Sequence, residues 1–189
     1  MFYRGPFYHA GNYRLLPSAA AWLPVLMAQA VWWAAILSGA LLAAAALLLQ
    51  FALAWWLDRD NVPSLRRLPR LCGSGLLLDA LTVQLGLVQF RDAAAFGLPL
   101  WLVLLWLSFA LTVPRLQRCL PNLASQLTLF AVAAPLAYFA GAALGAATIL
   151  HPFGYGVSLV AGWLALTLLW RVQAAAQPTA MRRQQSLSS

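Results

Sequence analysis

Long apolar runs, broken by short segments rich in arginine and proline, dominate the pattern along the chain. The first run, residues 15–57, carries no charged residue. As one helix it would extend about 65 Å, roughly twice the ~30 Å hydrocarbon core of a bilayer. It must therefore fold back on itself, and Ser38 with Gly39 offers a natural turn. The pattern predicts one membrane-spanning helix over residues 19–37 and a second over residues 40–57.

Two further spans are predicted from the middle of the chain. Residues 71–90 lie between Arg70 and Arg91 and would cross the hydrocarbon core as one helix about 30 Å long. A fourth helix is expected over residues 95–114, where Pro114 would end it. Each of these apolar runs is about as long as one helix needs to be to cross the hydrocarbon core of a bilayer.

The last apolar run and the polar ends of the chain complete the predicted organisation. Residues 119–170 are uncharged and long enough for two helices, with the break expected at residues 151–156, where proline and glycine disfavour a helix. The predicted fold class is an all-α membrane protein, a compact bundle of six transmembrane helices over residues 18–172. Residues 1–17 are expected to lie at the membrane interface, and residues 173–189 to form a disordered cytoplasmic tail.

Composition and charge support this architecture and suggest an orientation. The chain is 63% hydrophobic and 8% charged, whereas a soluble domain carries about 25% charged residues. If both termini lie in the cytoplasm, eleven of the twelve arginines fall on the cytoplasmic side and Arg91 alone lies outside, in keeping with the positive-inside rule. The net charge of +8 suits anionic lipid head groups. Nucleic acid is not an expected partner, because the arginines form no continuous basic groove.

Asp79, in the middle of the third predicted span, is the leading candidate for a functional group. A lone carboxylate at that depth costs about 2.5 to 3.5 kcal/mol on insertion scales, so it normally faces protein or trapped water. Counted from the nearest cytoplasmic charge, Gln50, Ser108 and Gln126 lie at a similar depth, about 10 to 14 Å. The four residues could form one polar layer. Two interpretations remain open: a hydrated pocket that binds a head group or a proton, or structural contacts worth about 0.6 kcal/mol each.

Glycines at helical spacing suggest how the predicted bundle packs. Gly75 and Gly86 share one face of the third span with Asp79. Gly141 and Gly145 form a GxxxG on the fifth span. Because small residues allow membrane helices to approach closely, the third and fifth helices are predicted to pack together through these glycines.

Several familiar chemistries have no basis in the sequence. The two histidines and two cysteines are too far apart to suggest a metal site or a disulfide framework. No phosphate-binding loop, paired carboxylates or nucleophile motif is present. No cofactor, metal or catalytic residue is therefore predicted, although the lack of a motif leaves an enzymatic role undecided.

Part of the sequence resembles a known family. The resemblance is strongest over residues 99–112, PLWLVLLWLSFALT, and extends over residues 73–147. Further residues that carry it are Gly75, Asp79, Gly86, Phe90, Pro135, Tyr138, Gly141 and Gly145. The pattern resembles the bacterial inner-membrane family called domain of unknown function 2878. The resemblance implies a compact multi-pass inner-membrane protein without an assigned activity, in genomic neighbourhoods that contain enzymes modifying membrane acyl chains.

Three functional hypotheses follow from the sequence. The first is a non-catalytic module that associates with membrane lipids or with another inner-membrane protein, with Asp79 in its interior. The second is a small solute or proton carrier, similar in size and helix count to the substrate-binding membrane subunits of vitamin importers. The third is a lipid-modifying enzyme that uses Asp79 as acid or base.

Overall fold

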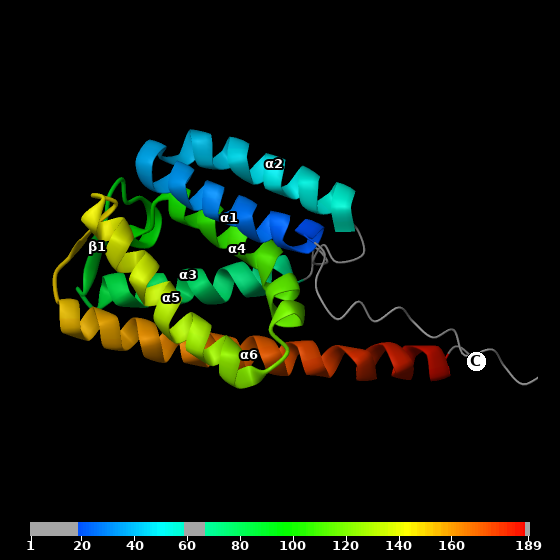
Figure 1. Cartoon of the computed structure of the whole chain (residues 1–189). Helices are drawn as coiled ribbons and strands as arrows, with labels where there is room; N and C mark the ends of the chain where they lie inside the picture. Colours follow the sequence, from blue (N-terminus) through cyan, green and yellow to red (C-terminus); the bar gives the residue numbers. More distant parts are fainter. Residues whose placement is uncertain (1–18, 59–66, 188–189) are drawn as a thin grey trace, which may run out of the picture.

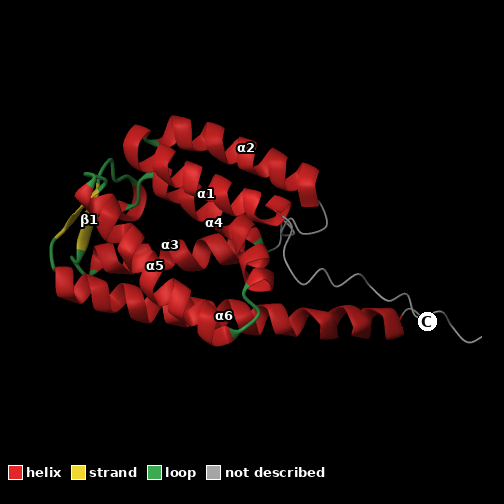
Figure 2. Ribbon diagram, in the orientation of Figure 1, coloured by secondary structure: helices red, strands yellow, loops and turns green. Residues whose placement is uncertain are grey.

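The computed structural model describes residues 19–58 and 67–187 of the chain (Figure 1). The predicted interfacial segment, residues 1–17, lies outside this range. The α-helices in the described part are α1 (Ala19–Ser38), α2 (Ala40–Asp58), α3 (Leu68–Gln84), α4 (Leu100–Cys119), α5 (Leu123–Ala143) and α6 (Pro152–Leu187). Two short strands, β1 (Val88–Phe90) and β2 (Ala147–Ile149), and a 3-10 turn, η2 (Ala95–Gly97), complete it. The prediction of an all-α protein built from six helices is confirmed, apart from this small strand pair (Figure 2).

The turn predicted between the first two helices is confirmed. α1 ends at Ser38, Gly39 adopts φ +78°, and α2 begins at Ala40. The Gly39 N–H donates to the carbonyl of Ala35 at 3.1 Å, which closes the last turn of α1. Glycine suits this position because it adopts a positive φ without steric cost.

The prediction that the third helix runs through Phe90 is wrong, because α3 ends at Gln84. Gly86 adopts φ +67° and donates to the carbonyl of Val83 at 2.9 Å, while the Leu87 N–H donates to Thr82 at 3.0 Å. This left-handed glycine cap ends the helix. The chain then continues as β1.

α5 ends in the same way, so the two strands meet. Gly145 adopts φ +82° and donates to the carbonyl of Ala142 at 2.9 Å. β1 and β2 then pair antiparallel, with Val88 opposite Ile149 and Phe90 opposite Ala147. The pairing ties together the ends of α3 and α5 and the starts of α4 and α6, on the left of Figure 1.

The boundaries of the last helices also differ from the prediction. Pro99 is the extended N-cap residue of α4, and Pro114 lies inside the helix instead of ending it. α6 begins at Pro152, a residue suited to the first turn because its missing N–H would be unpaired there. α6 continues to Leu187, through the segment expected to be a disordered tail.

Among the described residues, three helical stretches are long and apolar enough to cross a membrane: Leu100–Gln117, Leu123–Ala143 and Pro152–Gln173. Val25–Ser38 and Ala40–Trp56 are shorter apolar helical stretches. These apolar helices are typical of a membrane protein.

The helices pack around α4 and α6. α1 and α2 form a hairpin that covers one side of α4, while α3 lies between α4 and α6, and α5 packs along α6 (Figure 1). A cluster of stacked and edge-on aromatic rings fills the space between α4, α5 and α6. Its members are Trp106, Phe109, Phe130, Trp163 and Trp170.

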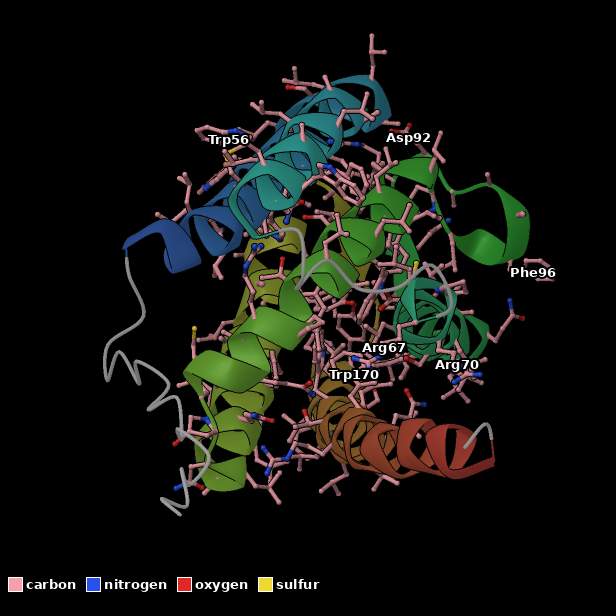
Figure 3. The ribbon with its side chains drawn as sticks, turned by 90° about the vertical axis from the view of Figure 1, so that its right-hand side faces the viewer. Trp56, Arg67, Arg70, Asp92, Phe96 and Trp170 are labelled. Carbon is pink, nitrogen blue, oxygen red and sulfur yellow. The ribbon has the colours of Figure 1, made fainter. Side chains whose placement is uncertain are left out.

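The described arginines divide between the two ends of the bundle. Arg67 and Arg70, with Trp170 nearby, lie at the end that faces the viewer in Figure 3. Arg91 lies at the opposite end, beside the strands. Its guanidinium donates to the carbonyl of Ile36 at 2.9 Å and of Gly145 at 3.4 Å. It therefore links the C-terminal ends of α1 and α5, where carbonyl groups attract a cation.

Candidate functional site

Asp79 is completely buried, and its hydrogen-bond partners are aromatic side chains. The indole Nε1–H of Trp106 donates to Oδ2 at 2.6 Å. The hydroxyl of Tyr138 lies 2.8 Å from Oδ1 and 3.0 Å from Oδ2. The carboxyl of α3 is thus held by one donor from α4 and one from α5, which satisfies a group that would be costly to bury alone.

The backbone of α3 allows Trp106 to reach this carboxyl. A Cβ placed on Gly75 would overlap the six-membered ring of Trp106. The other side of the indole stacks on Trp163, with 5.3 Å between ring centroids and 18° between planes. Trp106 is therefore enclosed between α3 and α6, with its N–H directed at Asp79.

Gln50 and Ser108 form a second buried group, between α2 and α4. The Ser108 hydroxyl donates to Gln50 Oε1 at 2.6 Å. The Gln50 amide donates to the Ser108 carbonyl and to Thr112 Oγ1, both at 3.2 Å. Trp106 and Ser108 are two positions apart and so point to different sides of α4. The structure brings two of the four predicted polar residues together, but α4 separates them from Asp79.

Gln126, the fourth predicted residue, is buried near the start of α5. Its amide donates to the backbone carbonyls of Leu120 and of Gln117, the latter at 3.4 Å. These bonds close the connection between α4 and α5. The single polar layer expected from counting depth is therefore three separate groups.

The glycines do not make the predicted contact between the third and fifth helices. Gly75 faces Trp106 of α4, and a Cβ on Gly141 would meet Ile36 of α1 at 3.4 Å. Gly86 and Gly145 have positive φ and no atoms within 4 Å of an added Cβ. Gly86 and Gly145 cap the C-terminal ends of α3 and α5. The glycine spacing that suggested a packing stripe therefore includes two helix-capping glycines.

A cavity of about 280 Å³ lies between α1, α4 and α5, with Trp163 of α6 in its wall. Gln29 of α1 and Ala133 of α5 line it and are exposed, so its mouth lies between these helices. Along α4 its wall runs from Trp101 to Leu116, about 22 Å by helix rise. Aromatic residues in its wall include Trp32, Trp101, Trp106, Phe109, Phe130 and Trp163.

Two residues that contact Asp79, Trp106 and Tyr138, also line the cavity. Both lie among the residues that carry the family resemblance, and no role was predicted for either. The available signal was the polar atom that each aromatic side chain carries, since a buried indole N–H or phenol O–H usually finds a partner. Asp79 therefore lies directly behind the cavity wall.

The described residues contain no cluster of three or more His, Cys, Asp or Glu side chains that could hold a metal ion. The arrangement offers a mostly apolar cavity that runs along α4, with a few polar side chains in its wall, among them Gln29, Ser108, Thr112 and Tyr138. Pockets of this composition bind apolar molecules and use their few polar groups to orient them.

Comparison with known proteins gives one match. No curated protein and no solved structure is significantly similar to the chain. The profile of the family described as "protein of unknown function (DUF2878)" matches residues 21–170, which include every residue that lines the cavity and the residues around Asp79. The chain therefore belongs to the DUF2878 family, as the resemblance over residues 73–147 predicted.

Proposed function

We propose that the protein is a non-catalytic, membrane-embedded module that holds one apolar chain of a lipid in the cavity between α1, α4 and α5. The observation that carries this proposal is the cavity itself. Its wall runs about 22 Å along α4, and aromatic and aliphatic side chains form most of it. A chain that leaves the bilayer gains contact with these side chains without losing an apolar environment.

The mouth of the cavity supports entry from the side. Residues on the outer faces of α1 and α5 next to the mouth are apolar and exposed, among them Leu26, Trp33, Val132 and Leu136. In a six-span bundle these faces would contact lipid, and a chain would enter between α1 and α5 past mostly apolar side chains, with Gln29 at the mouth. We place the bundle in a bacterial inner membrane with both termini in the cytoplasm.

A cavity-filling substitution tests the proposal. Ala134 of α5 lines the cavity, so Ala134→Trp should block it. The purified wild type should carry a co-purified chain-bearing lipid at near one-to-one stoichiometry by native mass spectrometry, and Ala134→Trp should lose it.

Ala140→Trp is the matched control. Ala140 is exposed on the same helix and does not line the cavity, so this variant should keep the bound lipid. Equal occupancy in Ala134→Trp and the wild type would contradict the proposal, provided that both variants elute as the same folded species.

A proton or cation carrier is the second candidate, and the surroundings of Asp79 favour it. The hydrogen-bond donors that reach Asp79 from the described residues, Trp106 and Tyr138, are both neutral. A carboxyl without a cationic partner could bind a proton or a cation in turn. If the protein is a carrier, Asp79→Asn should abolish proton or cation uptake into proteoliposomes. If it is not, Asp79→Asn should leave the occupancy of the co-purified lipid unchanged.

A further inference from the structure

Several polar side chains in the cavity wall are already engaged by neighbouring groups. Ser108 and Thr112 line the cavity, but the Ser108 hydroxyl donates to Gln50 at 2.6 Å. The Thr112 hydroxyl donates to the Ser108 carbonyl at 2.9 Å and accepts from Gln50 at 3.2 Å. The Tyr138 hydroxyl is held by Asp79. These groups stabilise contacts between helices and are not the ones that orient a ligand.

Gln29 of α1 differs from them, because this residue is exposed at the mouth of the cavity. No hydrogen bond within the described part of the chain involves its side chain. A glutamine amide has two N–H donors and a carbonyl acceptor. Both kinds of group on Gln29 can therefore meet a ligand that enters the cavity.

The amide of Gln29 belongs to the face of α1 that forms the cavity wall. The residues of α1 that line the cavity recur at helical spacing and so share one side of the helix: Val25, Ala28, Gln29, Trp32 and Ile36. Gln29 lies in the middle of α1 (Figure 1), about 14 to 15 Å by helix rise from either end. In a six-span bundle this depth is close to the middle of a hydrocarbon core about 30 Å thick.

An amide at this depth is costly when it faces only hydrocarbon, which offers it no hydrogen-bond partner. A diacyl phospholipid does not supply one either, because its ester groups and head group lie at the interface, about 15 Å away. A charged group is itself costly near the middle of the bilayer. The group that suits Gln29 is therefore neutral, polar and carried on the chain itself.

We propose that the cavity selects a lipid whose chain carries a neutral oxygen group, a hydroxyl or a carbonyl, near its middle, and that Gln29 binds this group. A hydroxyl can accept from the amide N–H of Gln29 and donate to its carbonyl oxygen, and a carbonyl can accept. The apolar parts of the chain extend from there toward Trp101 and Leu116, the two ends of the wall along α4. This inference rests on the proposed function, because it specifies which kind of chain the cavity holds.

Competition binding to the full-length protein in nanodiscs tests the selection. The probe is tritiated ricinoleate, an oleate chain with one mid-chain hydroxyl, and the unlabelled competitors are ricinoleate, oleate and alpha-hydroxyoleate. Ricinoleate should compete about tenfold better than oleate, the factor expected for one hydrogen bond. Alpha-hydroxyoleate is an isomer of ricinoleate whose hydroxyl lies beside the carboxylate at the interface, so it should compete no better than oleate.

Substitutions at the mouth should move this preference. Gln29→Leu should remove the preference for ricinoleate and leave competition by oleate unchanged, because leucine keeps an apolar contact without the amide. In the Gln29→Leu background, Ala133→Gln should restore part of the preference, since Ala133 is exposed and lines the cavity from α5. Ala30→Gln in the same background is the control: Ala30 is exposed but does not line the cavity, so it should restore nothing.

Three outcomes would overturn one or both proposals. Saturable binding with equal competition by ricinoleate, its isomer and oleate overturns the selection and leaves the chain-binding function intact. An unchanged preference in Gln29→Leu, with loss of an oligomer by native mass spectrometry, overturns the selection by Gln29 and assigns this residue to contact with a second copy. No saturable binding of the probe, together with no co-purified lipid, overturns both proposals.

Discussion

At Gly75 the packing of α3 on α4 leaves no room for a side chain, because the Trp106 ring occupies that space. Gly75→Ala should therefore displace Trp106 and weaken its hydrogen bond to Asp79. Overpacking of this kind costs about 1 to 3 kcal/mol. A titration with a denaturing detergent, followed by circular dichroism, should show unfolding at a lower denaturant fraction.

Gly73→Ala is the control on the same helix. An added Cβ at Gly73 meets no atom within 4 Å, so this variant should be neutral or stabilised by up to about 1 kcal/mol through helix propensity. Identical unfolding midpoints for Gly75→Ala and Gly73→Ala would show that the Trp106 ring can move without loss of stability.

A second prediction concerns Asp79 and the two side chains that donate hydrogen bonds to it. Asp79→Leu leaves the Trp106 N–H and the Tyr138 hydroxyl without their acceptor, at a cost of about 1 to 3 kcal/mol for each group. Adding Tyr138→Phe should recover part of this loss, because it removes one of the unpaired groups. The same detergent titration measures both variants, and a double variant less stable than Asp79→Leu alone would refute this account.

These residues also mark the limit of what the sequence could predict. Asp79 could be identified because a carboxylate in an apolar run is costly and has to be explained. Its partners could not, because Trp106 and Tyr138 are ordinary aromatic residues of a membrane helix until the helices are packed. The depth estimate placed Gln50 and Ser108 at one level, but it contained no information about which side of α4 each would face.

At the scale of whole elements, Arg91 fixes the strand end of the bundle. It binds the carbonyls that end α1 and follow α5, and its backbone N–H donates to Ala146 at 2.9 Å. Arg91→Gln should loosen this end, with hydrogen exchange of the β1 and β2 amides faster by about fivefold to tenfold, since the partly exposed bonds are worth about 1 kcal/mol.

The control for Arg91→Gln is Arg70→Gln, at the far end of the bundle, where the side chain is exposed. Its exchange rates in β1 and β2 should equal those of the wild type. Unchanged exchange in Arg91→Gln would mean that the strand pair alone holds these helix ends.

The helix ends show why element boundaries were harder to predict than element number. Apolar runs separated by polar segments were enough to predict six helices. The end of α3 depended on Gly86, whose role as a helix cap was hidden by an apolar sequence that continues to Phe90. The Leu-Gly pairs at residues 85–86 and 144–145 were the available signal, because a glycine after a helical segment often adopts the left-handed cap conformation.

At the scale of the whole molecule, the positions of the arginines indicate how the bundle is oriented in the membrane. Arg67 and Arg70 lie at the end of α3 that is remote from the strands (Figures 1 and 3). Arg171 of α6 donates to the carbonyl of Pro121, in the connection between α4 and α5, at 2.9 Å. Arg91 lies at the strand end, where it is engaged with backbone carbonyls. Because arginine is enriched on the cytoplasmic side of membrane proteins, the end remote from the strands should face the cytoplasm.

Accessibility to a reagent that cannot cross the membrane tests this orientation. In a background with Cys72→Ala and Cys119→Ala, Asp92→Cys should react with an impermeant maleimide in intact spheroplasts, because the Asp92 side chain is 71% exposed beside the strands. Arg70→Cys should react only after the membrane is permeabilised, and a reporter fused after Ser189 should be active in the cytoplasm. Labelling of Arg70→Cys in intact spheroplasts, or a periplasmic reporter, would reverse the orientation.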